Sequence, residues 1–334
     1  MRAKGICYDT GFIHKGTSSQ VFDADAARRD MRAIRDRLRC DAVRVTGGDP
    51  ERLKIAARHA ADAGLEVWLC PFTCDVGADD LLDMLADLAS FAEDLRRGGA
   101  EIVLLTGSEL SIMVPGFVPG DAYAERATRV REAMPEIPAL INDFLAKAVA
   151  VVRGRFGGKI SYASLPFENV DWEPFDYIAT DTGYRFSAIA DRYPELMRAF
   201  ASQGKPAAIT EFGCATYRGA ADEGPASHDV IAYDPDTGAP VGLKRELIRD
   251  EAEQARYLTE VLTVLDESGV DTAFWFGFVW YGSVHDPRDP ARDFDAASCG
   301  VVAAIDDDHH WEPKAAFDAL AGYDVTPGAS RPPR

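Results

Sequence analysis

Residues 41–51, DAVRVTGGDPE, contain a strand, a turn and the start of a helix within one short stretch. The first five residues are largely apolar or β-branched, which favours a buried strand. Gly47 and Gly48 supply the turn, and Asp49 followed by Pro50 is typical of a helix N-terminus, with an aspartate cap and proline in the first turn. A strand that passes through a short turn into a helix is the unit of α/β folds.

This unit recurs along the chain, because apolar strand-like runs alternate with segments whose apolar residues are spaced by three and four. The strand-like runs are residues 4–8, 41–45, 66–72, 101–106, 159–165, 177–181, 206–211 and 272–278. Eight such runs favour a closed barrel, so we predict an α/β protein with a single (β/α)8 TIM barrel. The barrel is expected to span residues 1–325, and residues 326–334 are expected to be a disordered tail.

The structural alternative is an open, doubly wound sheet of the Rossmann type. No GxGxxG pattern follows the first strand-like run, however. Residues 154–160, GRFGGKI, miss the phosphate-binding loop pattern because Ile160 stands where serine or threonine is required. The motifs therefore give this alternative no support.

Composition excludes several kinds of partner. The 334-residue chain has a formal net charge of −19, whereas nucleic-acid binding usually needs a basic face. No apolar run approaches the roughly 20 residues of a membrane helix, and no signal peptide is recognised at the start. We therefore expect a cytoplasmic protein with a small-molecule substrate, such as a sugar, and no nucleic-acid or membrane partner. The oligomeric state stays open.

Cysteines and histidines give no pattern for a metal or cofactor. The six cysteines contain no CxxC pair, and we expect them to be reduced. His309 and His310 follow three aspartates and could suggest a metal site, but a solvated loop is the expected structure. No metal ion and no organic cofactor is predicted.

Glu109 and Glu211 are the candidate catalytic residues. Catalytic groups of these barrels lie at the carboxyl ends of the strands, and each glutamate follows an apolar run, residues 102–105 and 207–209. Two partly desolvated carboxylates that face each other repel, so one keeps its proton and can act as an acid. The alternative is that each glutamate forms a structural ion pair with an arginine such as Arg44.

Other polar and aromatic side chains also fall at predicted strand ends. The candidate substrate-binding residues are Arg44, Ser108, Glu168, Asp181, Tyr184, Trp275 and Trp280. Glu168 and Asp181 could equally cap the helices that follow them. Only one parity of the aromatic run 274–281 can line a pocket, because alternate residues of a barrel strand point towards the helices. His228 and His285 lie in the long loops after strands seven and eight, so either could reach the substrate, but exposure to water is the more ordinary outcome for a loop histidine.

These residues together resemble the large clan of retaining glycoside hydrolases with (β/α)8 barrels. The resemblance rests on residues 210–213 (TEFG), Glu109, Arg44 and the tryptophan-rich eighth strand. It implies that Glu109 is the general acid/base and Glu211 the nucleophile, with their carboxyl groups about 5–5.5 Å apart. It also implies that Arg44 keeps the nucleophile ionised. Trp275 or Trp280 would form a platform on which the sugar stacks.

The chain departs from that clan immediately before the acid/base. The clan usually has asparagine there, and this chain has Ser108, which cannot offer the same two-ended amide contact. The turn GSELS and the run TEFGC also look like actinobacterial proteins labelled abortive infection proteins.

Three functions remain open from the sequence. The first is a retaining glycosidase that acts on a glycoside or small acetal. The second is a non-hydrolytic acid–base enzyme, a cyclase, lyase or isomerase, that uses the same site. The third is a barrel that binds a ligand or partner in phage defence without catalysis. The long loops after strands four, seven and eight favour an enclosed pocket, hence exo-action or a small substrate.

Overall fold

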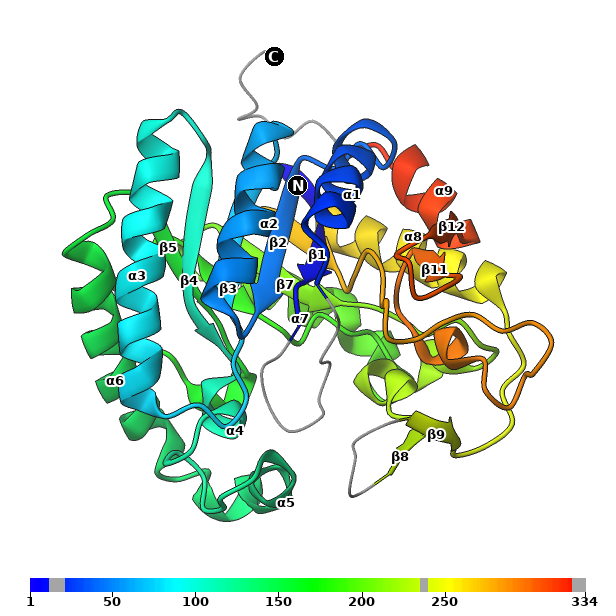
Figure 1. The fold of residues 1–334 in the computed structure, drawn as a ribbon. Coiled ribbons are helices and arrows are strands. Elements are labelled where there is room, and N and C mark those ends of the chain that lie inside the picture. The colour runs from blue at the N-terminus through cyan, green and yellow to red at the C-terminus, as the bar shows by residue number, and fades with distance from the viewer. Residues whose placement is uncertain (12–21, 235–239, 326–334) are drawn as a thin grey trace.

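The computed structural model describes residues 1–11, 22–234 and 240–325, and Figure 1 shows its eight-stranded barrel surrounded by helices. The strands of the barrel are β1 (Ala3–Asp9), β2 (Ala42–Gly47), β3 (Glu66–Pro71), β4 (Ile102–Ser108), β5 (Lys159–Ala163), β6 (Ile178–Thr180), β7 (Ala207–Phe212) and β10 (Thr272–Trp275). They pair in the order β5-β4-β3-β2-β1-β10-β7-β6, and every pair in this sheet is parallel. A parallel bridge between Ser164 and Thr180 brings β5 and β6 together. The predicted (β/α)8 barrel is therefore confirmed.

Helices cover the outside of this sheet. The α-helices are α1 (Ala24–Asp36), α2 (Pro50–Asp62), α3 (Ala78–Arg97), α4 (Leu110–Met113), α5 (Tyr123–Ala133), α6 (Ile137–Arg153), α7 (Tyr193–Ala201), α8 (Glu251–Glu267) and α9 (Ala315–Gly322). The predicted start of α2 is confirmed, since the Asp49 carboxylate accepts hydrogen bonds from the amides of Glu51 and Arg52 at 2.8 and 3.1 Å. No described helix is long and apolar enough to cross a membrane. The predicted tail, residues 326–334, lies outside the described residues.

The apolar core has two layers. One fills the barrel interior, where the Trp68 ring packs edge-on against Tyr177 and Phe274 at 4.9 and 5.2 Å. The other, larger layer lies between the sheet and the helices. Because the interior is filled by side chains, only the mouth of the barrel is open to a ligand.

The carboxyl ends of the strands carry the irregular segments. In Figure 1 the strands run towards the lower end of the molecule, where α4, α5 and the hairpin β8 (Ile231–Tyr233) and β9 (Pro240–Leu243) gather. A second small hairpin joins β11 (Val302–Ala304) and β12 (Trp311–Pro313) near α9. The mouth therefore has walls built by segments that the regular barrel unit does not contain.

The fifth strand–helix unit departs from the repeat. Between β5 and β6, residues 164–177 form one 3-10 turn, η1 (Pro166–Glu168), and no α-helix. The rest of this connection is a loop in which the rings of Trp172 and Phe175 pack edge-on at 5.7 Å. The Lys205 ammonium donates hydrogen bonds to three carbonyl oxygens of the loop. One position in the outer ring of helices is therefore left to a loop.

Candidate active site

Three acidic side chains meet at the carboxyl ends of the barrel strands. Glu109 follows β4, Asp181 follows β6, and Glu211 lies in β7. We call these three residues the carboxylate floor. Glu109 has a left-handed backbone conformation (φ 49°, ψ 36°), which is uncommon for a residue with a side chain and is often found at functional sites. Its amide donates to the Ala163 carbonyl at 3.0 Å, which fixes this turn against β5.

The Arg44 guanidinium links the floor to the barrel interior. Arg44 is fully buried in β2, and its Nη1 lies 3.0 Å from Asp181 Oδ1 and 3.6 Å from Glu211 Oε2. Nη1 also donates to the Thr210 carbonyl at 3.0 Å, and Nη2 donates to the Ser108 hydroxyl at 2.9 Å. A buried guanidinium needs such partners, and Asp181 provides the closer of its two carboxylate contacts.

Ser108 is part of the same network. Its hydroxyl donates a short hydrogen bond to Asp181 Oδ2 while it accepts one from Arg44. Asp181 therefore receives donors from both Arg44 and Ser108. The Ser108 side chain is fully buried, and its hydroxyl is engaged in both of these hydrogen bonds. It therefore helps to hold Asp181 in place from the interior of the barrel.

The two glutamates differ in their hydrogen-bond partners. The Tyr184 hydroxyl donates to Glu211 Oε1 at 2.7 Å, on the other side of this carboxylate from Arg44. Among the described residues, no donor makes a hydrogen bond to the carboxylate of Glu109, which is partly exposed to the cavity. An ionised carboxylate is stabilised by donors, so the negative charge belongs on Glu211 first.

Burial raises the pKa of both glutamates. For Glu211 the burial effect is followed by repulsion from Asp181, and the pKa rises to about 8 although Arg44 and Tyr184 oppose the change. For Glu109, burial and then the charges of Asp181 and Glu211 hold the pKa well above its usual range. Both carboxyl groups therefore hold a proton to higher pH than an ordinary glutamate does, and of the two only Glu211 has neighbouring groups that stabilise its charged form.

A cavity of about 1160 Å³ opens above the floor. Its polar base is made by Glu109, Asp181, Glu211 and Tyr184, and its walls are mostly apolar and aromatic. This volume lies above the roughly 300–1,000 Å³ usual for small-molecule sites, so the cavity has room for more than one sugar ring.

The predicted site residues fall into three groups. Those that line the cavity are Glu109, Asp181, Tyr184, Glu211 and Trp280. Arg44 and Ser108 do not line it but hold the floor through hydrogen bonds. Glu168 and Trp275 belong to neither group.

Trp275 does not occupy the predicted stacking position. Its ring is fully buried between the sheet and the helices, packed edge-on against Phe212, and its indole N–H donates to the Cys299 carbonyl at 2.7 Å. Because side chains alternate along the strand, the next residue, Phe276, lines the cavity together with Trp280. Of the two predicted platforms, only Trp280 can reach a ligand in the cavity.

Glu168 has structural partners in place of a ligand. Its carboxylate accepts hydrogen bonds from the Tyr162 hydroxyl at 2.9 Å and from the amides of Leu165 and Ser111 at 2.8 and 3.1 Å. The side chain is fully buried and does not line the cavity, so contacts within the protein replace the predicted substrate contact. Burial raises the pKa of Glu168, while its donors oppose that change.

Several cavity residues were not predicted as site residues. Phe72 and Cys74 line the cavity from the loop after β3, Tyr123 from α5, and Phe276 from the segment after β10. His228, expected to be exposed to water, is half-buried in the cavity wall, and desolvation lowers its pKa to about 4. The His228 ring packs on Phe276 and Trp280, at 6.0 and 5.8 Å between centroids. Both parities of the eighth strand contain aromatic residues, so its sequence does not single out Phe276, and no local pattern places the His228 ring beside Phe276 and Trp280.

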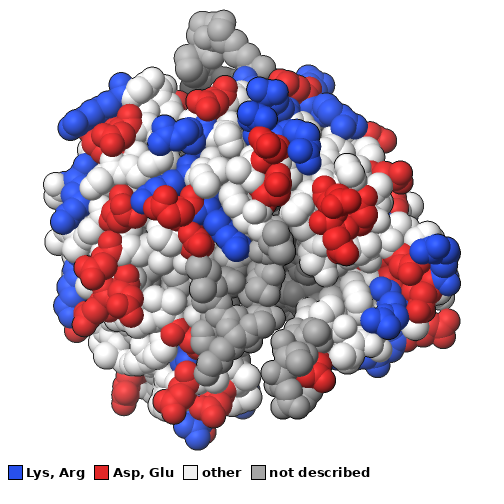
Figure 2. All heavy atoms as spheres, in the orientation of Figure 1, with Lys and Arg blue, Asp and Glu red and all other residues white. Residues whose placement is uncertain are grey.

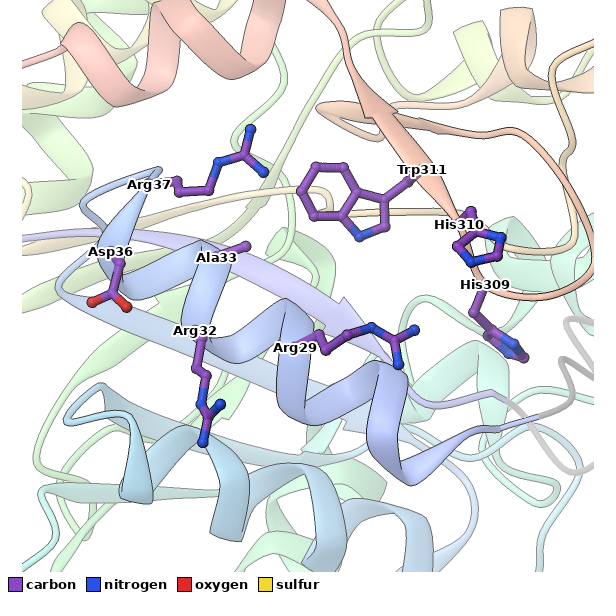
Figure 3. Close-up of a pocket in the computed structure, with 8 residues that line it drawn as sticks. All are labelled: Arg29, Arg32, Ala33, Asp36, Arg37, His309, His310 and Trp311. Carbon is purple, nitrogen blue, oxygen red and sulfur yellow. The ribbon is translucent and has the colours of Figure 1, made fainter.

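A second pocket, of about 450 Å³, lies on the outer surface, away from the floor. Figure 3 shows Arg29, Arg32 and Arg37 on the α1 side and Trp311 with two histidines on the other side. The Arg37 guanidinium lies 5.2 Å from the centre of the Trp311 ring, and His310 Nδ1 lies 2.8 Å from Asp306 Oδ2. None of the predicted site residues lines this pocket.

Neither a cluster of metal ligands nor a patch of one charge marks a further site. No cluster of three or more potential metal ligands occurs among residues 1–11, 22–234 and 240–325. Acidic and basic side chains are interspersed on the face of the molecule shown in Figure 2.

Comparison with known proteins gives a likeness of fold. The sequence matches no family model and no curated protein. Among solved structures, a GH113 β-1,4-mannanase superposes with a TM-score of 0.58 and 16% identity, covering 96% of this chain and 98% of its own. The GH113 β-mannanase AaManA from Alicyclobacillus acidocaldarius gives 0.57 and 18%, covering 95% and 96%.

A third similar structure is the exo-β-1,4-mannosidase Op5Man5 from Opitutaceae bacterium strain TAV5. It gives a TM-score of 0.55 and 12% identity, covering 96% of this chain and 58% of its own. The chain thus has the (β/α)8 fold of known glycoside hydrolases, at identities that establish the fold alone. The likeness to abortive infection proteins finds no support in these matches.

Proposed function

We propose that the protein is a retaining glycosidase that acts on a glycoside or a small acetal, with Glu109 as general acid/base and Glu211 as nucleophile. The observation that carries the proposal is the unequal surroundings of two glutamates in one cavity. Glu211 has an ion pair with Arg44 and a hydrogen bond from Tyr184, whereas no such interaction of the Glu109 carboxylate occurs among the described residues. Glu211 should therefore lose its proton before Glu109, and the pairing of one ionised and one protonated carboxyl group that the reaction needs would form as the pH rises towards the Glu211 pKa of about 8.

The proposed reaction has two steps. In the first, Glu109 gives its proton to the glycosidic oxygen as that bond breaks, and a Glu211 carboxylate oxygen bonds to the anomeric carbon. In the second, Glu109 takes a proton from water, whose oxygen displaces Glu211 from the same carbon. The sugar leaves with its original configuration, and both glutamates return to their starting protonation states.

Arg44 and Tyr184 have supporting roles in this proposal. Both interact with Glu211 in the free protein, so both lower the energy of its charged form before attack. Asp181 competes for Arg44 at the shorter distance, 3.0 against 3.6 Å. The nucleophile is therefore less fully ionised at neutral pH than it would be with Arg44 to itself.

A second candidate function uses the same acid without a glycosyl intermediate. The apolar walls of the cavity, and a floor where Ser108 is occupied by Arg44 and Asp181, favour a cyclase, lyase or isomerase that acts on an apolar metabolite. In that reaction Glu109 would protonate the substrate and Glu211 would not become covalently attached.

A panel of activated aryl glycosides tests the proposal. We expect the wild type to turn over at least one of them, Glu211→Ala to lose turnover, and azide to restore it as a glycosyl azide. Glu109→Ala should slow substrates with poor leaving groups far more than those with good ones. Glu132→Ala, an exposed glutamate on α5, is the matched control and should behave as wild type. Wild-type protein that is inert to every glycoside would favour the second candidate.

A further inference from the structure

The cavity extends beyond the floor to the place where the fifth barrel helix is missing. This extension, which we call the outer arm, is lined by apolar side chains of the β5–β6 loop and of the segment leading into and through α7. They are Val170, Trp172, Ile189, Leu196, Met197 and Phe200. The outer arm and the carboxylate floor belong to one continuous cavity.

The α7 helix presents one face to the outer arm. Leu196 and Phe200 are four residues apart, so they project from the same side of the helix. At 1.5 Å per residue these two side chains are about 6 Å apart along the helix. Leu196 and Phe200 are only half-buried, so they keep apolar surface that an elongated ligand could cover.

The missing helix explains why this surface is open. In the other units a helix covers the outer face of the strands, whereas here the loop 169–177 lies over β5 and β6. That loop is anchored at its start, because Asn142 of α6 donates to the Asn169 carbonyl and accepts from the Asp171 amide. Its end is anchored by Lys205 through the carbonyls of Trp172, Glu173 and Phe175. The loop that forms one wall of the arm is therefore held at both of its ends.

The charges of the cavity lie away from this arm. The acidic residues that line the cavity are Glu109, Asp181, Glu211 and Asp229, and none of the six residues of the outer arm is charged. A ligand that fills both regions has a polar end on the floor and an uncharged, apolar end in the arm.

We infer that the outer arm binds an apolar aglycone, so that the substrate is a sugar linked to an alkyl or isoprenoid-like chain. The inference rests on the proposed function, since it places the sugar on the floor. The arm opens beside β5 and β6, next to the strand that carries Glu109. The group that Glu109 protonates as it leaves is therefore on the side of the arm. The arm and the floor line one cavity, so a molecule in the arm can reach the two glutamates. This favours a substrate as the occupant over a second copy of the chain or a peptide.

A series of alkyl glycosides, from methyl to octyl, tests this inference on a sugar that the wild type hydrolyses. Burial of a methylene contributes about 0.8 kcal/mol, so kcat/KM should rise by about two- to fourfold for each added carbon until the arm is full. Leu196→Asn and Phe200→Asn should each reduce the ratio of octyl to methyl activity at least fivefold. Val170→Trp, which fills the arm, should reduce the same ratio without placing a polar group there.

Ile55→Asn is the matched control, because Ile55 is a 36% exposed apolar side chain on α2, outside the cavity. It should leave the activity on both glycosides at the wild-type value. Equal activity on methyl and octyl glycosides would overturn the inference. So would arm variants that lower both activities equally, or that change only the oligomeric state.

Calorimetric binding separates this inference from the proposed function. If no glycoside is hydrolysed but octyl glycoside binds much more tightly than methyl glycoside, and Phe200→Asn removes the difference, the arm is a binding site and the reaction is wrong. If glycosides are hydrolysed but chain length has no effect, the reaction is right and the inference about the arm is wrong.

Discussion

The carboxylate floor and the outer arm belong to one cavity but are built from opposite kinds of side chain. Asp181 of the floor is buried and bound to Arg44 and Ser108 beneath it, so each of these polar groups depends on its neighbours. In the arm, Leu196 and Phe200 are half-buried and contribute only apolar surface. Replacing one group on the floor leaves another buried and unpaired, whereas a change in the arm removes only its own contacts. Single substitutions should therefore have much larger effects on the floor.

Arg44→Met should give the largest effect. It leaves the buried Asp181 carboxylate without its cation, which typically costs about 3–5 kcal/mol of folding stability. Urea denaturation measures this loss. The double variant Arg44→Met/Asp181→Asn should recover part of it, because the unpaired charge is gone. A loss below about 1 kcal/mol in the single variant would mean that Arg44 does not hold the floor together.

Tyr184→Phe should have the next largest effect, on activity and its pH dependence. The variant removes the hydrogen bond to Glu211, and a bond to a charged group is worth about 1.5–3 kcal/mol, so kcat/KM should fall about ten- to a hundredfold. Turnover requires ionised Glu211, whose pKa is about 8 in the free protein, so activity rises with pH towards that value. In the variant this rise should move to higher pH.

Tyr193→Phe is the control for that experiment. The Tyr193 hydroxyl is also buried, but it donates to the Gly183 carbonyl at 2.6 Å and touches no carboxylate of the floor. It should lower thermal stability without moving the pH profile. An identical shift in both variants would argue against a direct role of Tyr184 at Glu211.

Glu211→Gln should alter the pH dependence of stability. The folded protein holds a proton on Glu211 up to a pKa of about 8, whereas the ordinary value is 4.5, so wild-type stability decreases as the pH rises between these values. Glutamine has no such proton. The Tm of the variant relative to wild type should therefore be a few degrees higher at pH 8 than at pH 5. Glu132→Gln should show no such trend, and a flat difference for Glu211→Gln would contradict the raised pKa.

The two tryptophans of the eighth unit should give the smallest and most clearly separated effects. Trp280→Phe keeps an aromatic wall in the cavity, so KM should change by less than about fivefold while the Tm is preserved. Trp275→Phe removes the hydrogen bond to the Cys299 carbonyl, so the Tm should fall while KM is unchanged. The reverse result, a KM effect only at Trp275, would contradict the side-chain parity described above.

The barrel itself was predictable from the sequence because its units repeat. Apolar runs of residues such as 102–105 and 207–209 set the strands, and local signals such as Asp49 before Pro50 set helix starts. The placement of Glu109 and Glu211 at one end of the barrel followed from that strand map alone. Their catalytic roles remain predictions.

The predictions that failed concern residues whose placement depends on tertiary contacts. In residues 274–281 both parities are aromatic, so sequence could not choose between Trp275 and Phe276, and the register shifts between Ala273 and Trp275. The helix α5 was expected to be loop, because it buries little more than Arg126 and Ala133. Arg126 contacts Asp75 across the mouth, a distant interaction that local patterns do not reveal.

Covalent trapping tests the central claim most directly. The protein would be incubated with an activated 2-deoxy-2-fluoro glycoside of the sugar that the panel selects, digested, and its peptides measured by mass spectrometry. We predict one added fluoroglycosyl group, on the peptide that contains Glu211, and none in Glu211→Ala. An unmodified wild-type protein that still hydrolyses the parent glycoside, or a label on another residue, would contradict the assignment of Glu211 as the nucleophile.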